Sequence, residues 1–128
     1  MKTVLIVEPN EELQISLREA LQDRYLVYAC RDGSEAMSFM HLAPDVLILD
    51  LLLSEIDGLT FLEKVSHMRP EHVIVITPII SNSILHRLSV LGTNAVIRKP
   101  CRIEAIVDSV HSLTSQDHRR SRWLALAL

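Results

Sequence analysis

The chain has 128 residues, enough for one domain with a buried core, and its 48% hydrophobic content excludes an intrinsically disordered protein. Its net charge of −3 excludes the basic surface typical of nucleic-acid-binding domains, so we expect no direct contact with nucleic acid. No apolar stretch approaches the ~18 to 20 residues that cross a bilayer, and a strand is expected so close to Met1 that no room is left for a signal peptide. We therefore expect a cytoplasmic protein without membrane contact.

Short apolar runs alternate along the chain with longer segments of helical periodicity. The first strand is expected at residues 3–7, and Asn10 is expected to cap the helix that follows. The apolar positions of this helix, spaced to form one buried face, are Leu13, Leu17, Ala20 and Leu21. The second strand is expected at residues 25–30, and Asp32 is expected to cap a short helix that ends before Pro44.

The second half of the chain repeats this alternation three more times. Strands are expected at residues 46–49, 73–76 and 95–98, and helices at residues 59–68, 83–91 and 102–113. Gly92 follows the second of these helices as a left-handed cap. Strands that alternate with helices at this spacing predict an α/β fold in which right-handed crossovers build a doubly wound parallel sheet.

Polar residues stand where four of the apolar runs end. These residues are Glu8, Asp50, Thr77 and Lys99. In an open parallel sheet, ligands bind at the carboxyl ends of the strands, so we expect these four side chains to meet at one rim. Two acids, a hydroxyl and an ammonium are a set that can hold a divalent cation and a phosphoryl group.

The cysteines and histidines do not indicate a disulfide framework or a zinc site. Cys30 and Cys101 are too few for a framework and are expected to be reduced, mostly buried thiols. The six histidines are scattered, and none pairs with another histidine or a cysteine at helical metal-ligand spacing.

From about residue 2 to residue 113, the chain resembles the receiver domains of two-component response regulators. The resemblance rests on an ordered set of residues at matching spacings, namely the run 45–50 ending at Asp50, then Asp57-Gly58, Thr77, Gly92 and Lys99-Pro100. It implies a flavodoxin-like (βα)5 fold with strand order 2-1-3-4-5. It also implies a signalling domain that receives a phosphoryl group and does not turn over an external substrate.

The resemblance assigns a role to each residue at the rim. Asp50 would be the phosphoacceptor, and Thr77 and Lys99 would bind the phosphoryl oxygens. Glu8, Asp50 and the backbone carbonyl of Leu52 would bind Mg²⁺ weakly. The Lys99-Pro100 peptide bond would be cis. A histidine kinase or phosphotransfer protein would donate the phosphoryl group, and the domain would switch an output surface, most simply in transcriptional regulation.

Several positions depart from the family pattern. Pro9 stands where receivers have a second acid, and Ser54 replaces a loop proline. Pro78 stands where a backbone N–H contacts the phosphoryl group, a loss worth about 1.5 to 3 kcal/mol. Val96 occupies the position of the switch aromatic. Glu8 itself has two interpretations, as a metal ligand or as an acid that favours the positive end of the first helix.

These departures keep a second function class open, a phosphorylation-independent pseudo-receiver that acts as a dimerisation or interaction module. A flavin- or nucleotide-binding enzyme is disfavoured, because no glycine-rich loop follows the first strand. We expect a homodimer through the fourth helix, fifth strand and fifth helix, since the segment around the fourth helix is too apolar for one buried stripe. Its apolar residues are Ile79, Ile80, Ile84, Leu85, Leu88, Val90 and Leu91.

The domain organisation follows from the same pattern. Residues 1–114 are expected to form the receiver domain. Residues 115–128, a polar and basic link followed by a new apolar run that starts at Trp123, are expected to be a linker or the start of a truncated C-terminal effector domain.

Overall fold

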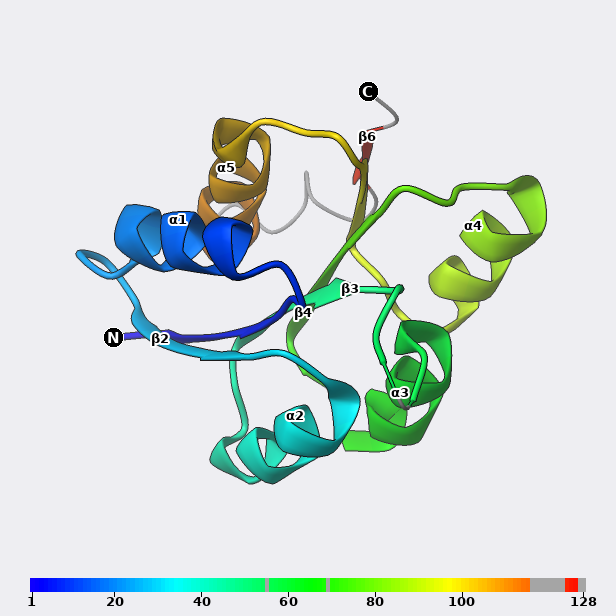
Figure 1. Cartoon of the computed structure of the whole chain (residues 1–128), viewed down its shortest axis with the longest axis horizontal. Coiled ribbons are helices and arrows are strands. Elements are labelled where there is room, and N and C mark those ends of the chain that lie inside the picture. The colour runs from blue at the N-terminus through cyan, green and yellow to red at the C-terminus, as the bar shows by residue number, and fades with distance from the viewer. Residues whose placement is uncertain (55, 69, 116–123, 127–128) are drawn as a thin grey trace.

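The computed structural model describes residues 1–54, 56–68, 70–115 and 124–126. Within these residues a parallel sheet has the order β2-β1-β3-β4-β5-β6 (Figure 1). Its strands are β1 (Thr3–Val7), β2 (Leu26–Cys30), β3 (Val46–Asp50), β4 (His72–Thr77), β5 (Ala95–Arg98) and β6 (Leu124–Leu126). The helices are α1 (Glu11–Leu21), α2 (Gly33–Phe39), α3 (Gly58–Val65), α4 (Asn82–Val90) and α5 (Ile103–Thr114), with 3₁₀ turns η1 (Met40–Leu42) and η2 (Ser66–Met68).

The first five strands and their helices confirm the flavodoxin-like (βα)5 fold and the strand order 2-1-3-4-5. The helix expected at residues 59–68 divides into α3 and η2. The short strand β6 is an addition that the sequence did not predict. The remainder of the expected linker or effector segment, residues 116–123 and 127–128, lies outside the described residues.

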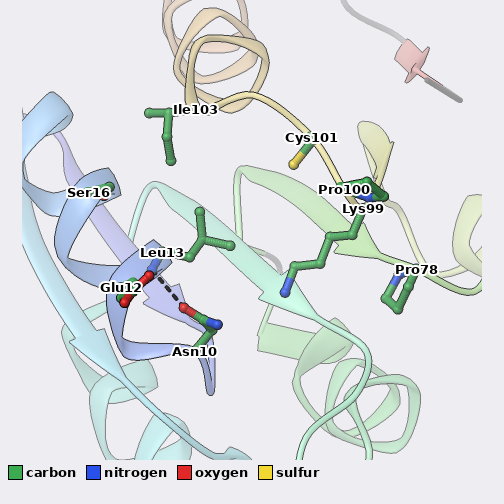
Figure 2. Close-up of a pocket in the computed structure, with 9 residues that line it drawn as sticks. All are labelled: Asn10, Glu12, Leu13, Ser16, Pro78, Lys99, Pro100, Cys101 and Ile103. Atoms are coloured by element: carbon green, nitrogen blue, oxygen red, sulfur yellow. Dashed lines mark hydrogen bonds between the residues drawn. The ribbon is translucent and has the colours of Figure 1, made fainter.

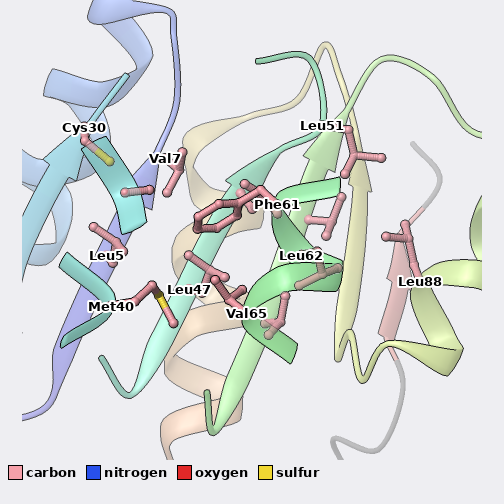
Figure 3. Close-up of a cluster of buried hydrophobic side chains, with 14 of the residues drawn as sticks. Leu5, Val7, Cys30, Met40, Leu47, Leu51, Phe61, Leu62, Val65 and Leu88 are labelled. Atoms are coloured by element: carbon pink, nitrogen blue, oxygen red, sulfur yellow. The ribbon is translucent and has the colours of Figure 1, made fainter. Parts of the chain in front are cut away.

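Helices cover both faces of the sheet, as Figure 1 shows. α1 and α5 pack on one face, and α2, α3 and α4 pack on the other. Successive strand side chains point to opposite faces, so Leu5 and Val7 of β1 join one core cluster while Val4 and Ile6 join the other. Burial on both faces explains why the strands are continuous apolar runs. Phe61 of α3 packs within the cluster beneath α2, α3 and α4 (Figure 3).

Short polar side chains begin most of the helices. Asn10 Oδ1 accepts a hydrogen bond from the Leu13 backbone N–H at 2.9 Å, and Asp32 Oδ1 accepts one from Glu35 at 2.8 Å, as the sequence predicted. Gly92 has a φ of +88°, which confirms its role as a left-handed cap after α4. The expected inward position of Ala20 is wrong, because α1 presents this residue to solvent.

The apolar segment around α4 is only partly exposed. Leu88 is fully buried, and a set of half-buried residues packs against the same core cluster: Ile80, Ile84, Leu85 and Leu91. Ile79 and Val90 are 49% and 69% exposed. Most of the apolar residues of this segment therefore pack into the core and do not form an exposed apolar surface.

Within the part of the chain that is described, the helices are too short or too polar to cross a membrane.

Candidate functional site

The carboxyl ends of β1, β3, β4 and β5 bring the predicted polar residues to one rim of the sheet. Glu8 directly follows β1, Asp50 and Thr77 are the last residues of β3 and β4, and Lys99 directly follows β5. Glu8 and Thr77 are fully buried, and Asp50 is 2% exposed. Parallel register in adjacent strands places these ends together, so the predicted convergence is confirmed for the rim as a whole.

Lys99 is the centre of the charged cluster. Its ammonium donates to Asp50 Oδ2 at 2.6 Å and lies 2.8 Å from Glu8 Oε1. The other oxygen of Asp50 accepts a hydrogen bond from the Leu52 backbone N–H at 2.9 Å. Asp50 is thus a buried carboxylate held by two donors. The cluster contains two carboxylates and one ammonium, so the ammonium can neutralise only one of the two acids.

Glu8 is held less completely than Asp50. Its Oε2 accepts a hydrogen bond from the Asn10 backbone N–H at 2.8 Å, whereas Oε1, although in ion-pair contact with Lys99, has no well-angled hydrogen-bond donor. Burial raises the pKa of Glu8, an effect that the ion-pair contact with Lys99 and the hydrogen bond from Asn10 only partly offset. The pKa of Lys99 is raised despite its own desolvation, because hydrogen bonds and charge attraction from Asp50 and Glu8 favour the ammonium form. Glu8 therefore belongs to the charged cluster, and its two interpretations, as a metal ligand or as an acid that favours the positive end of α1, stay predictions.

Thr77 lies at the rim, but its hydroxyl bonds within its own loop. Oγ1 accepts a hydrogen bond from the Ile79 backbone N–H at 3.2 Å and lies 3.5 Å from the Ile79 carbonyl oxygen. The backbone of Thr77 is joined to the cluster, since its carbonyl accepts from the Lys99 backbone N–H at 2.9 Å. To donate to a group on Asp50, the hydroxyl has to turn its hydrogen away from the Ile79 carbonyl.

Gly58 and Gln14 contribute to the site in ways that the sequence did not reveal. A Cβ on Gly58 would lie 2.5 Å from the Asp50 carbonyl oxygen and 2.5 Å from the Leu51 Cα, so only glycine allows the start of α3 to pack here. Gln14 Nε2 donates to the backbone carbonyls of Glu8 and Cys30 at 3.2 and 2.9 Å, which joins α1 to the ends of β1 and β2. The Asp57-Gly58 pair could be found from the sequence because it belongs to the family motif, whereas no sequence feature indicated that Gln14 contributes to the site.

An open groove of about 490 Å³ lies beside Lys99 (Figure 2). Leu13 of α1 and Ile103 of α5 line its apolar wall, and Pro78 and Cys101 border it near Lys99. The Lys99-Pro100 bond at its edge is cis, as the resemblance implied. Pro78, which carries no N–H, lines the groove together with Lys99.

The charged cluster offers a cation two carboxylates, those of Glu8 and Asp50. Glu8 Oε1 is a buried carboxylate oxygen without a hydrogen-bond donor, and a hard cation such as Mg²⁺ prefers oxygens of this kind. Across residues 1–54, 56–68, 70–115 and 124–126, no group of three or more His, Cys, Asp or Glu residues is arranged to hold a metal ion. The donors therefore fit Mg²⁺ only as a two-carboxylate site, in which the ion competes with the Lys99 ammonium. Cys30 and Cys101 are free thiols.

Comparison with known proteins agrees with this geometry. A model of the response regulator receiver domain matches residues 4–111. The chain is 31% identical to a protein-glutamate methylesterase/protein-glutamine glutaminase of Rhodospirillum rubrum, over all of this chain and 38% of that protein. A protein of the same description from Carboxydothermus hydrogenoformans is 32% identical over 76% of this chain and 29% of its own length. The chain thus spans well under half the length of these relatives.

Solved structures share the fold. A receiver domain protein from Methanospirillum hungatei superposes with a TM-score of 0.81 at 22% identity, covering 88% of this chain and 92% of that one. The chemotaxis protein CheY4 of Vibrio cholerae gives a TM-score of 0.78 at 23% identity, covering 88% and 98%. From the match over residues 4–111 together with the rim of acidic, hydroxyl and ammonium groups, we conclude that this chain belongs to the response regulator receiver domain family.

Proposed function

We propose that this domain accepts a phosphoryl group on Asp50 from a phosphohistidine of a histidine kinase or phosphotransfer protein. One observation carries the proposal: Asp50 ends β3 as a buried carboxylate whose two oxygens are held by the Lys99 ammonium and the Leu52 N–H. A carboxylate fixed at the rim of a parallel sheet is placed to act as a nucleophile. Members of this family typically interact with histidine kinases, and the receiver domain is not itself catalytic.

The transfer needs no change in oxidation state. A carboxylate oxygen of Asp50 attacks phosphorus, the P–N bond to the donor imidazole breaks, and its electron pair returns to that ring. The product is an acyl phosphate, in which the aspartyl charge has moved outward onto the phosphoryl oxygens. The Lys99 ammonium, now bonded to Asp50 Oδ2, can then pair with those oxygens as a compact positive charge.

Receiver domains generally bind Mg²⁺ at the phosphorylation site. In this chain Glu8, Asp50 and the carbonyl of Leu52 would hold the ion, which would neutralise negative charge on the phosphoryl oxygens. Pro9 supplies no third carboxylate and Lys99 already contacts both acids, so we expect weak binding. An NMR titration that shifts no amide near Glu8, Asp50 or Leu52 up to about tens of millimolar Mg²⁺ would remove the metal from the proposal.

The proposed switch runs from Asp50 to the loop between β4 and α4. Phosphoryl oxygens near Thr77 would draw its hydroxyl away from the Ile79 backbone, to which it bonds in this state. The loop would follow, and with it the surface of α4, β5 and α5, where we expect partners or a second copy to bind. Transcriptional regulation is the output we propose for the complete protein, in the cytoplasm, where kinases draw phosphoryl groups from ATP.

We assign residues 1–114 to the receiver and residues 115–128 to a linker or the start of an effector. The methylesterase relatives are longer than this chain. An enzymatic effector domain is therefore an alternative to a transcriptional one as the domain that follows the linker.

A phosphorylation-independent interaction module is the second candidate. Three positions favour it. Pro9 lacks the second metal-binding acid of the family, and Pro78 lacks the backbone N–H that contacts the phosphoryl group. Val96, 1% exposed in the core, lacks the aromatic ring that changes its rotamer in the family switch. The retained cluster of Glu8, Asp50 and Lys99 opposes it, because ionised groups buried without a use are costly to keep.

Mass measurement of the intact chain separates the two candidates. Small acyl phosphates and a panel of histidine kinases are supplied as donors, to wild type, to Asp50→Asn, and to Asp45→Asn as a matched control before the start of β3. We expect one phosphoryl group on wild type and Asp45→Asn, none on Asp50→Asn, and slow labelling by small donors because Pro78 crowds the rim. Labelling of Asp50→Asn would move the site elsewhere, and an unlabelled wild type would favour the interaction module.

A further inference from the structure

The outer edge of β5 pairs with a second segment of the chain. β6 runs parallel to β5, with Ala95, Val96 and Ile97 opposite Leu124, Ala125 and Leu126. Without this partner, β5 would end the receiver sheet and present a row of unpaired backbone N–H and C=O groups. With β6 in place, the three β5 residues are at most 1% exposed, and their side chains belong to the two core clusters. The pairing shows that this edge can accept a short extended segment, Leu124-Ala125-Leu126.

The handedness of the crossover from β5 to β6 indicates whether the same chain or a second copy supplies that strand. From β1 to β2 the chain moves one way along the sheet, with α1 on the face that α5 shares. From β2 to β3, β3 to β4 and β4 to β5 it moves the opposite way, with α2, α3 and α4 on the other face. Reversing both direction and face preserves the hand, so these four crossovers have the same one.

The connection from β5 to β6 breaks this pattern. It continues in the direction of the three preceding steps, yet its helix, α5, lies on the α1 face of the sheet (Figure 1). A crossover whose helix lies on that face has the opposite hand to the other four. Because parallel crossovers are right-handed in almost all sheets, pairing within one chain uses the disfavoured topology.

A second copy of the chain resolves this conflict. If Leu124–Leu126 comes from another molecule, the β5 edge keeps its hydrogen bonds and no reversed crossover forms. Each copy offers one edge and one strand, so reciprocal exchange closes a two-fold dimer. We propose that this chain forms a strand-exchanged homodimer, in which residues 124–126 of each copy add to the β5 edge of the other.

The proposal is independent of phosphorylation and is tested on the whole 128-residue chain. Light scattering over a concentration series compares wild type with Leu124→Asp/Leu126→Asp. The control is Val90→Asp, which places one added negative charge on the exposed surface of α4. We expect a wild-type dimer, a dissociation constant raised about 100-fold or more in the double variant, and an unchanged dimer in Val90→Asp. A wild type that stays monomeric, or a dimer lost in Val90→Asp but kept in the double variant, would overturn the proposal.

The origin of the strand is read directly by NMR on a mixture of isotope-labelled and unlabelled chains. Exchange predicts nuclear Overhauser contacts between residues 95–97 of one molecule and residues 124–126 of another. Contacts that occur only within one molecule would establish the reversed crossover and overturn the exchange, whatever the oligomeric state.

Discussion

Replacement of Lys99 by Met is the change to which the site should respond most strongly. The variant keeps the length and apolar stem of the side chain but leaves Glu8 and Asp50 buried without their shared cation. Removing one partner of a buried ion pair costs about 3 to 5 kcal/mol. Because the Lys99 side chain is 21% exposed and both carboxylates keep one backbone N–H, we expect the lower end, about 3 kcal/mol. This is a large part of the ~5 to 15 kcal/mol that stabilises a typical domain.

The pH dependence identifies the cause of that loss. Burial already raises the pKa of Glu8 above 4.5, and removal of the ammonium raises it further. A raised pKa in the folded state contributes stability at low pH that is lost as pH rises through the folded pKa. The deficit of Lys99→Met should therefore be small near pH 4.5 and grow above it, by at most about 1.4 kcal/mol per pH unit for this one proton.

Urea unfolding between about pH 5 and pH 8 measures both effects. The control is Lys64→Met, which changes an exposed lysine of α3. If Lys99→Met costs no more than Lys64→Met at neutral pH, or if its deficit does not change with pH, then the cluster does not depend on the ammonium as we have argued.

Three further predictions follow from neighbouring groups. Glu8→Gln removes a carboxylate whose pKa is raised in the folded state, so that its ionisation opposes folding. The free energy of unfolding of the variant at neutral pH should therefore be no lower than that of wild type. A loss above about 1 kcal/mol in urea unfolding would contradict this. Gly58→Ala should cost about 1 to 3 kcal/mol, since its Cβ meets backbone at 2.5 Å, whereas Gly33→Ala, with no atom nearer than 3.4 Å, should cost less; equal thermal shifts would refute the close approach. Burial raises the pKa of Cys30 to about 12 and leaves its residue 2% exposed, so mass spectrometry after iodoacetamide treatment at neutral pH should find Cys101 alkylated first; equal rates in the folded state would show that Cys30 is accessible.

The fold was predictable because each local signal agrees with the sheet. Apolar runs of β-branched residues became the buried strands, and Asn10, Asp32 and Gly92 began or ended helices where short polar side chains or a positive φ permit. The strand β6 was missed because a short apolar run has no periodicity of its own, and only the free edge of β5 gives it a partner.

The site was predictable in membership but not in its bonds. Residue type and position at strand ends placed Glu8, Asp50, Thr77 and Lys99 on one rim. Which atoms pair depends on side-chain reach and on competition between donors, and these are tertiary quantities. The Thr77 hydroxyl, for example, bonds the Ile79 backbone two residues away. The tolerance of Gly58 for only a hydrogen atom likewise depends on the path of the chain after β3.

Chemical trapping of the phosphorylated chain tests the central claim most directly. Borohydride reduces an aspartyl phosphate to homoserine with release of phosphate, and peptide mass spectrometry then locates the changed residue. We predict homoserine at position 50 in wild type treated with a histidine kinase and ATP, and no homoserine in Asp50→Asn. Homoserine at another aspartate, or a wild type that incorporates phosphate without any at position 50, would contradict the assignment of Asp50 as the phosphoacceptor.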